Sequence, residues 1–169
     1  LSIEKDSDKY QYIYPNFSIS KTLDTKFNDY GSFNYQASGF QKKSNTNISE
    51  TSFKNDLNFL SKPFFTKSGF KNDFNLFFKN ANFDAKNSST LKNDLNSNFY
   101  TSLILNSTLP LKKSSLNFAS EFKPKLSLRL SPARSENLIK KDRRINITNV
   151  FSNNRLGLSN SLEGGQSLT

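Results

Sequence analysis

The chain has 169 residues, a formal net charge of +10, 34% hydrophobic residues and a mean hydropathy of −0.67. This apolar content is poor material for a core buried on both sides. The chain contains no Cys, which excludes a disulfide framework and a thiolate metal site, and no His, the commonest metal ligand and general base. No run approaches the roughly 20 apolar residues of a membrane helix, so a helical membrane protein is also excluded for this segment.

The apolar residues, which include 17 Phe and 6 Tyr, recur at alternate positions through most of the chain. Because successive side chains of a strand point to opposite faces, each alternating run predicts a strand with one apolar and one polar face. Ile104 is the one strong exception to this pattern in its run. The predicted strands lie, in chain order, at residues 12–17 leading into 17–23, then at 32–39, 52–59, 70–79 and 95–109.

Polar segments rich in Asn, Ser, Lys, Gly or Pro separate these runs and predict the connections between strands. The chain is therefore expected to be a succession of roughly six or seven hairpin-related ribbons. The expected connections are a turn at residues 28–31, a polar linker at 41–50, a tight connection at 61–63, a loop at 86–93 and a turn at 110–113.

The longest run, residues 116–130, keeps apolar residues on one parity and mostly Asn, Glu, Lys, Ser and Arg on the other. At about 3.3 Å per residue it would reach about 50 Å, far beyond an ordinary globular strand. We therefore expect one continuous amphipathic strand here. A polar turn at 131–134 and two further elements at 149–157 and 162–169 follow it.

Amphipathic ribbons of this kind suit three environments. A soluble β-sandwich would bury the apolar faces of two sheets against each other. A solenoid would show a fixed period, which the uneven spacing of these segments does not provide. A transmembrane β-barrel uses segments of about 10 residues that alternate apolar-out and polar-in, with aromatic girdles and long loops. The abundant Phe and Tyr, the uneven loops and the long runs favour the barrel.

The predicted fold class is therefore all-β: an antiparallel transmembrane β-barrel segment, which taken alone would be an open curved sheet. The chain begins at Leu1 rather than Met and ends at Thr169 within an alternating pattern. We therefore expect residues 1–169 to be a fragment of a single outer-membrane β-barrel domain whose N- and C-terminal parts are missing. The remaining alternative is a disordered low-complexity chain, which would not be expected to keep its parity over so many segments.

The excess of 24 Lys+Arg over 14 Asp+Glu also invites a nucleic-acid interpretation. The basic residues are spread singly, with dense groups at residues 42–43, 112–113 and 140–144, and no nucleic-acid motif accompanies them. We therefore expect no nucleic-acid partner. A basic nucleic-acid-associated protein of a low-GC genome remains the alternative from outside the barrel class.

An enzyme is not expected. The sequence has no nucleophile elbow and no phosphate-cradling Gly-rich loop, and Gly164 and Gly165 fall far short of one. Its carboxylates are scattered over polar strand faces and loops, so no carboxylate dyad can be assigned. No catalytic residue, metal site or cofactor is predicted.

Residues 122–132, a polar interval, and residues 142–144, 150–157 and 162–169 carry a more specific pattern. Together they resemble the central barrel region of the LptD family of lipopolysaccharide-assembly proteins, also called organic solvent tolerance proteins. In that family an alternating strand precedes a phrase of the type lF-x-x-N-R-F-x-G-x-D-R-x-E-G-G-x-R-x-T. The residues that match the strand and the phrase are, in order, Pro124, Phe151, Asn154, Arg155, Gly157, Glu163, Gly164, Gly165 and Thr169.

Two departures from the family phrase stand out. Ser159 and Asn160 replace the acidic and basic pair, and Gln166 stands where a basic residue is usual. The resemblance implies transport rather than catalysis, in the outer membrane of a Gram-negative bacterium. It implies lipopolysaccharide as cargo, an LptE-like lipoprotein partner, a periplasmic lipopolysaccharide-transport bridge and contact with outer-membrane lipid. Within the barrel class, a porin-like channel or an autotransporter translocator is the alternative.

Four charged residues, Glu121, Lys123, Lys125 and Arg129, share the polar parity of the long run and are the lumen-facing candidates. If that face lines the lumen, the three cations offer partners for phosphate groups. The alternative is that they pair with Glu121 and with lumen carboxylates from elsewhere in the barrel.

The glycines of the family phrase are interpreted first as backbone devices. Gly157, Gly164 and Gly165 would permit a positive φ or a close approach where the chain leaves one strand for the next. Arg155 and Glu163 are expected to have a structural role, because a loop buried inside a barrel commonly needs a satisfied ion pair. A role in transport is the alternative for both.

Overall fold

The computed structural model describes residues 11–93, 95–115, 118–132, 147, 149, 150, 152 and 163–169. These residues form strands, turns and loops, and none of them belongs to a helix that could cross a membrane. The strands are β1 (Gln11–Leu23), β2 (Gly31–Ser44), β3 (Ser49–Ser61), β4 (Phe64–Phe65), β5 (Lys71–Lys86), β6 (Asn96–Thr108), β7 (Leu111–Ser114), β8 (Ala119–Phe122), β9 (Lys125–Ser131) and β10 (Gly165–Leu168).

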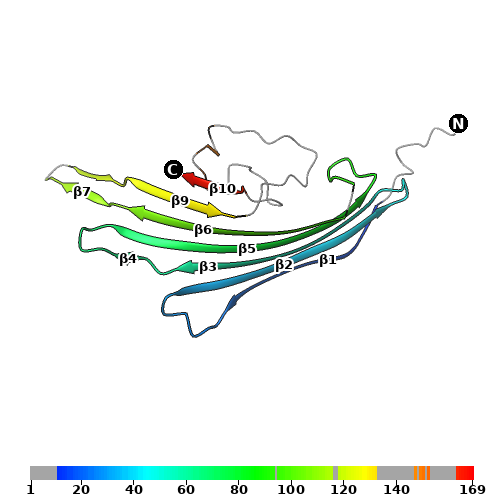
Figure 1. Cartoon of the computed structure of the whole chain (residues 1–169), viewed down its shortest axis with the longest axis horizontal. Helices are drawn as coiled ribbons and strands as arrows, with labels where there is room; N and C mark the ends of the chain where they lie inside the picture. The colour runs from blue at the N-terminus through cyan, green and yellow to red at the C-terminus, as the bar shows by residue number, and fades with distance from the viewer. Residues whose placement is uncertain are drawn as a thin grey trace.

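One antiparallel sheet contains most of these strands, in the order β1-β2-β3-β5-β6-β9-β10, with the short β4 paired to β5. The strands follow the chain order and curve together along their length (Figure 1). The prediction of an all-β, antiparallel fold is confirmed. Among the described residues β1 pairs with β2 alone and β10 with β9 alone, so the sheet is open at both edges.

The register assigns the two faces of the sheet, because directly paired residues of antiparallel strands lie on the same face. The first face, called the apolar face, carries Phe17, Ile19, Leu23, Phe33, Tyr35, Phe53, Leu57, Phe59, Phe74, Leu76, Phe78, Phe99, Leu103, Leu105, Leu126, Leu128 and Leu130. The second, called the polar face, carries Ser20, Asn34, Gln36, Lys54, Asp56, Asn58, Asp73, Asn75, Lys79, Asn106, Ser127 and Arg129.

Aromatic rings contact one another across the strands of the apolar face. Phe33 and Phe59 have ring centroids 4.5 Å apart, and Phe59 and Phe74 have centroids 5.7 Å apart. Phe59 also covers Gly31, where an added Cβ would come within 2.6 Å of its ring. The apolar face is therefore a packed layer of rings one side chain deep, and polar residues such as Lys21 and Asn55 interrupt it.

The band of apolar residues runs obliquely across the strands. An uneven edge of the band runs from Phe17 on β1 to Leu130 on β9; between them Phe53 lies in the row of Phe17 and Phe99 in the row of Ile19. The row of paired residues through Leu130 reaches β1 at Leu23, six residues beyond Phe17. Five strand-to-strand steps separate β1 from β9. With about 3.3 Å per residue and about 4.8 Å between strands, this edge of the band is inclined by about 40° to the rows of paired residues.

The polar linker predicted at residues 41–50 is wrong. β2 continues to Ser44 and β3 begins at Ser49, so only four residues connect them. The Ser44 amide donates to the Ile48 carbonyl at 2.9 Å, and Asn47 has φ of 59°, a conformation that Asn tolerates better than most residues. The end of β2 and the start of β3 carry polar residues on both faces, so apolar alternation does not indicate that these segments are strands.

The turn predicted at residues 110–113 is also wrong, and the continuous strand predicted at 116–130 is interrupted. β7 and β8 form a separate two-stranded hairpin beyond the end of the sheet (Figure 1). Thr108 faces Lys125 and Leu111 faces Phe122, which is the same register on either side of the break. Because proline has no amide hydrogen, Pro110 and Pro124 interrupt the hydrogen bonds without shifting the register.

Apolar residues also occur on the polar face, and those at the far end of β5 are buried. Ala81, Phe83 and Ala85 share the parity of Lys79, and they form a buried cluster with Leu91 of the loop after β5. Ala81 is completely buried. The small alanines leave room for this loop, so residues 87–93 fold back over the polar face.

Candidate functional site on the polar face

The centre of the polar face holds a cluster of charged side chains on β3 and β5. Lys79 faces Asp56 across the two strands, and its Nζ donates to Asp56 Oδ2 at 2.8 Å. The Lys79 residue is only 5% exposed. A buried ammonium group is costly unless it is paired and hydrogen-bonded. Asp56 therefore anchors Lys79 in the face.

Lys54 is the second cation of this cluster and is half-buried. Its Nζ lies 5.4 Å from the centre of the Phe83 ring, and the Lys79 Nζ lies 5.7 Å from the centre of the Phe77 ring. Both distances are within the range of a cation–π contact. The cluster thus contains two lysines and one carboxylate, that of Asp56, and each lysine lies over a different aromatic ring. It therefore has a local excess of positive charge.

A chain of hydrogen bonds continues the polar face toward β9. Asn106 Nδ2 donates to Asp73 Oδ1 at 2.7 Å, and Ser127 Oγ donates to Asn106 Oδ1 at 2.6 Å. The three residues lie on β5, β6 and β9, so the chain crosses three strands. These bonds hold the side chains at fixed positions on the face.

Arg129 connects the sheet to the C-terminal segment. Its side chain is 3% exposed, and its Nη2 lies 3.0 Å from Glu163 Oε1. Its Nε donates to Ser167 Oγ at 3.1 Å, and its Nη1 donates to the Glu163 carbonyl. Arg129 is therefore a partner of Glu163, a residue for which a structural role was expected. Arg155 lies outside the described residues.

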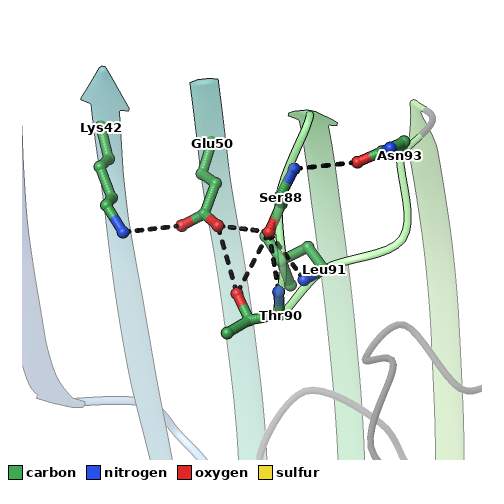
Figure 2. Close-up of polar contacts among 6 residues, drawn as sticks. All are labelled: Lys42, Glu50, Ser88, Thr90, Leu91 and Asn93. Atoms are coloured by element: carbon green, nitrogen blue, oxygen red, sulfur yellow. Dashed lines mark hydrogen bonds and ion pairs between the residues drawn. The ribbon is translucent and has the colours of Figure 1, made fainter. Parts of the chain in front are cut away.

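A second network anchors the loop after β5 to the strand β3 (Figure 2). Glu50 accepts hydrogen bonds from Ser88 Oγ and, at 3.2 Å, from Thr90 Oγ1, and it lies 3.5 Å from Lys42 Nζ. Ser88 Oγ in turn accepts from the amide of Leu91 at 2.9 Å. Glu50 is 6% exposed and fully engaged in these contacts, so it holds the loop in place over the polar face.

The four lumen-facing candidates are not gathered in one place. Glu121 lies in the exposed β7–β8 hairpin, where Lys123 Nζ is 2.7 Å and Lys112 Nζ is 3.6 Å from its carboxylate. The hydrogen bond from Lys123 holds the pKa of the Glu121 carboxyl below its usual value. Lys125 is exposed at the start of β9, and Arg129 is buried farther along the same strand.

In addition to Glu163, four residues of the family phrase lie within the described part of the chain. The Pro124 carbonyl accepts from the Leu109 amide at 3.1 Å, and the Thr169 amide and carbonyl both pair with Ser127. Gly165 starts β10 with φ of 85°, a conformation that favours glycine, and Gly164 precedes it. The remaining residues of the phrase lie outside the described residues; they are Phe151, Asn154, Arg155 and Gly157.

Sequence reasoning missed the central cluster and the loop anchor. Alternation in the runs 52–59 and 70–79 places Lys54, Asp56 and Lys79 on polar strand faces. The contact between Asp56 and Lys79 depends on the register between β3 and β5, which alternation alone does not provide. Glu50 had been placed in a linker. A signal was present in the sequence: Ala81, Phe83 and Ala85 are apolar residues at the parity of Lys79, which indicates that something covers this end of the face.

The polar face therefore presents cations, carboxylates and amides at fixed positions. Within the described part of the chain, no three His, Cys, Asp or Glu side chains come together as a metal site would require. Lysine ammonium groups held near aromatic rings can bind phosphate or carboxylate groups. Comparison with known proteins adds no identification: no model of a protein family, no curated protein and no solved structure matches this chain.

Proposed function

We propose that this chain is part of an outer-membrane β-barrel that delivers lipopolysaccharide to the outer leaflet, as LptD-like proteins do. The apolar face would contact lipid and the polar face would line the lumen. The observation that carries the membrane assignment is the exposed apolar face of a sheet whose other face is polar. A contiguous exposed apolar surface that crosses several neighbouring strands marks an interaction with a membrane or another protein.

The strand lengths support this assignment. The five long strands contain between 13 and 16 residues, whereas a tilted strand needs about 9–11 residues to cross a bilayer. On β3 the apolar residues extend from Phe53 to Phe59, which is about 20 Å along the strand. Exposed aromatic side chains extend this band at one end; they are Phe27, Tyr30 and Phe64. Such rings are typical of the aromatic girdles of outer-membrane barrels.

The oblique course of the apolar band also supports a barrel. In a transmembrane barrel the strands are tilted by about 35–45°, so a band parallel to the membrane must cross the rows of paired residues at that angle. The inclination of about 40° along the edge from Phe17 to Leu130 falls within this range. A β-sandwich would instead need a second sheet on the apolar face, and none packs there among the described strands.

Lipopolysaccharide is proposed as the cargo on two grounds. The first is the resemblance of residues 122–169 to the LptD family phrase. The second is the positive charge on the polar face, where the half-buried Lys54 would be the cation nearest to a phosphate group that passes along it. The proposed partners are an LptE-like lipoprotein and a periplasmic transport bridge, the proposed location is the outer membrane, and no catalytic activity is proposed.

Fractionation of cells tests the membrane part of this proposal. The protein should remain with outer membranes after a high-salt wash and should be released by detergent. A nucleic-acid-associated protein would instead be released by salt, because its binding depends on counterion release. Release by salt would therefore contradict the proposal.

A charge substitution on the polar face tests the cargo. Lys54→Gln should lower the amount of new lipopolysaccharide at the cell surface while the yield of folded protein stays unchanged, because Lys79 keeps its hydrogen bond to Asp56. Lys113→Gln removes the same charge from the exposed β7–β8 hairpin and is the matched control. If both variants deliver lipopolysaccharide normally, a porin-like or autotransporter barrel becomes the better assignment.

A further inference from the structure

A groove opens on the apolar face where strands β2, β3 and β5 meet their connecting loops. Its volume is about 1030 Å³, at the top of the range for ligand pockets. The floor is made of side chains of the apolar face, including Phe33, Phe59 and Phe74. The walls come from Phe27 and Tyr30 on one side and from Phe64 on the other.

The two walls are joined at one point by the backbone. The Lys62 amide donates to the Tyr30 carbonyl at 2.7 Å, which continues the pairing of β2 and β3 past the strand ends. The groove is therefore part of the folded sheet rather than a gap between independent loops. Its exposed walls are the same aromatic residues that extend the apolar band, so the groove lies where lipid headgroups would meet acyl chains.

The groove also has a charged rim. Lys62 lines it directly, and exposed Lys26 and Lys67 lie on the flanking loops. Asp29 lines the groove and Asp24 belongs to the same loop, so the lysines outnumber the carboxylates. Within the described chain, none of these three lysines forms an ion pair. The rim is thus complementary to a negative group that sits above an apolar chain.

From this arrangement we infer that the groove binds one anionic phospholipid, with an acyl chain between Phe27, Tyr30 and Phe64 and its phosphate at Lys62. The inference rests on the membrane placement proposed above, but it concerns the lipid-facing surface and not the passage of cargo along the polar face. The bound lipid would fill the hollow in the apolar face and cover its exposed rings. It would also fix the depth of this end of the sheet in the bilayer.

Fluorescence quenching by brominated lipids tests the inference. The chain has no Trp, so Phe64→Trp places a single reporter in the groove wall and Phe53→Trp places one on the apolar face away from it. Each protein is reconstituted in phosphatidylcholine vesicles that contain either brominated phosphatidylglycerol or brominated phosphatidylcholine at the same mole fraction. The groove reporter should favour phosphatidylglycerol by about threefold to fivefold, whereas the Phe53→Trp reporter should show no preference.

Lys62→Gln in the Phe64→Trp background should remove most of this preference, while Lys113→Gln, which removes an equal charge from the β7–β8 hairpin, should preserve it. Equal quenching by both lipids at the groove, or an unchanged preference in Lys62→Gln, would overturn the inference and leave the membrane placement standing. Absence of quenching by either lipid at both reporters would overturn the membrane placement as well.

Discussion

Glycine matters on the apolar face because aromatic rings occupy the space above it. A Cβ at Gly39 would come within 2.8 Å of the Phe17 ring and 3.0 Å of the Ser52 carbonyl oxygen. We expect Gly39→Val to lower the free energy of unfolding by about 1–3 kcal/mol. The valine side chain would displace the Phe17 ring and crowd the Ser52 carbonyl oxygen, which is part of the backbone of β3 and cannot move easily. Urea titration in micelles measures this change. Gln41→Val, on the same strand and face, is the control and should change stability by less than about 0.5 kcal/mol.

The ion pair between Arg129 and Glu163 shows how one side chain can hold a whole segment. Removing one partner of a buried pair leaves an uncompensated charge and typically costs about 3–5 kcal/mol. We therefore expect Arg129→Ala to detach β10, with faster amide exchange at Ser127 and Thr169, whose backbones pair. Arg129→Leu combined with Glu163→Leu should cost less than the two single changes together. Additive effects would show that the two side chains do not interact.

At the scale of elements, alternation predicted the central parts of the strands but not their ends. Residues 32–39 and 52–59 fall within β2 and β3, yet both strands extend beyond the apolar residues into the segment assigned as a linker. Strand pairing needs backbone hydrogen bonds, which polar residues make as well as apolar ones. Pro110 was expected to turn the chain and Pro124 to lie within a continuous strand, but both only break the hydrogen bonds. Whether a proline turns the chain or only breaks the hydrogen bonds depends on the partner strand, which sequence alone does not show.

The candidate site was predictable only in part, for a related reason. Parity correctly placed Lys79 and Asp56 on polar faces, but the contact between them requires the register of β3 on β5. The same holds for Arg129, whose partner Glu163 is 34 residues away in the chain. The resemblance to the LptD phrase drew attention to Glu163 but did not indicate its partner Arg129.

The loop after β5 is held by Glu50, and its mobility should therefore depend on that one side chain. Glu50→Ala removes the acceptor of Ser88 and Thr90, and an unmade buried hydrogen bond costs about 1–3 kcal/mol. We expect the amides of Ser88 and Leu91 to exchange with solvent about tenfold faster, while amides in the middle of β5 keep their protection. Asp84 is an exposed carboxylate near the end of β5, and Asp84→Ala is the control. Unchanged exchange would show that packing of Leu91 alone fixes the loop.

For the whole molecule, the question is whether lipid or water covers the apolar face, and two neighbouring residues on β1 can decide it. Ile19 is 56% exposed on the apolar face, and Ser18 is exposed on the polar face. In water, an exposed substitution at either position should change stability by no more than about 0.5 kcal/mol. In a bilayer, Ile19→Arg should cost about 2–4 kcal/mol if the residue lies near the midplane, whereas Ser18→Arg would face the lumen and cost little.

Lys21, two residues along the same strand, makes this comparison more demanding. It shows that the apolar face of β1 already carries one ammonium group, which can extend along its apolar stem toward the interface. An arginine at Ile19 would add a second cation to this face, one row nearer to the edge at Phe17 than Lys21. The asymmetry with Ser18→Arg should therefore persist. Unfolding free energies of the two variants, measured in vesicles, provide the test. Equal effects would place water on both faces of the sheet and would remove the physical basis for a barrel.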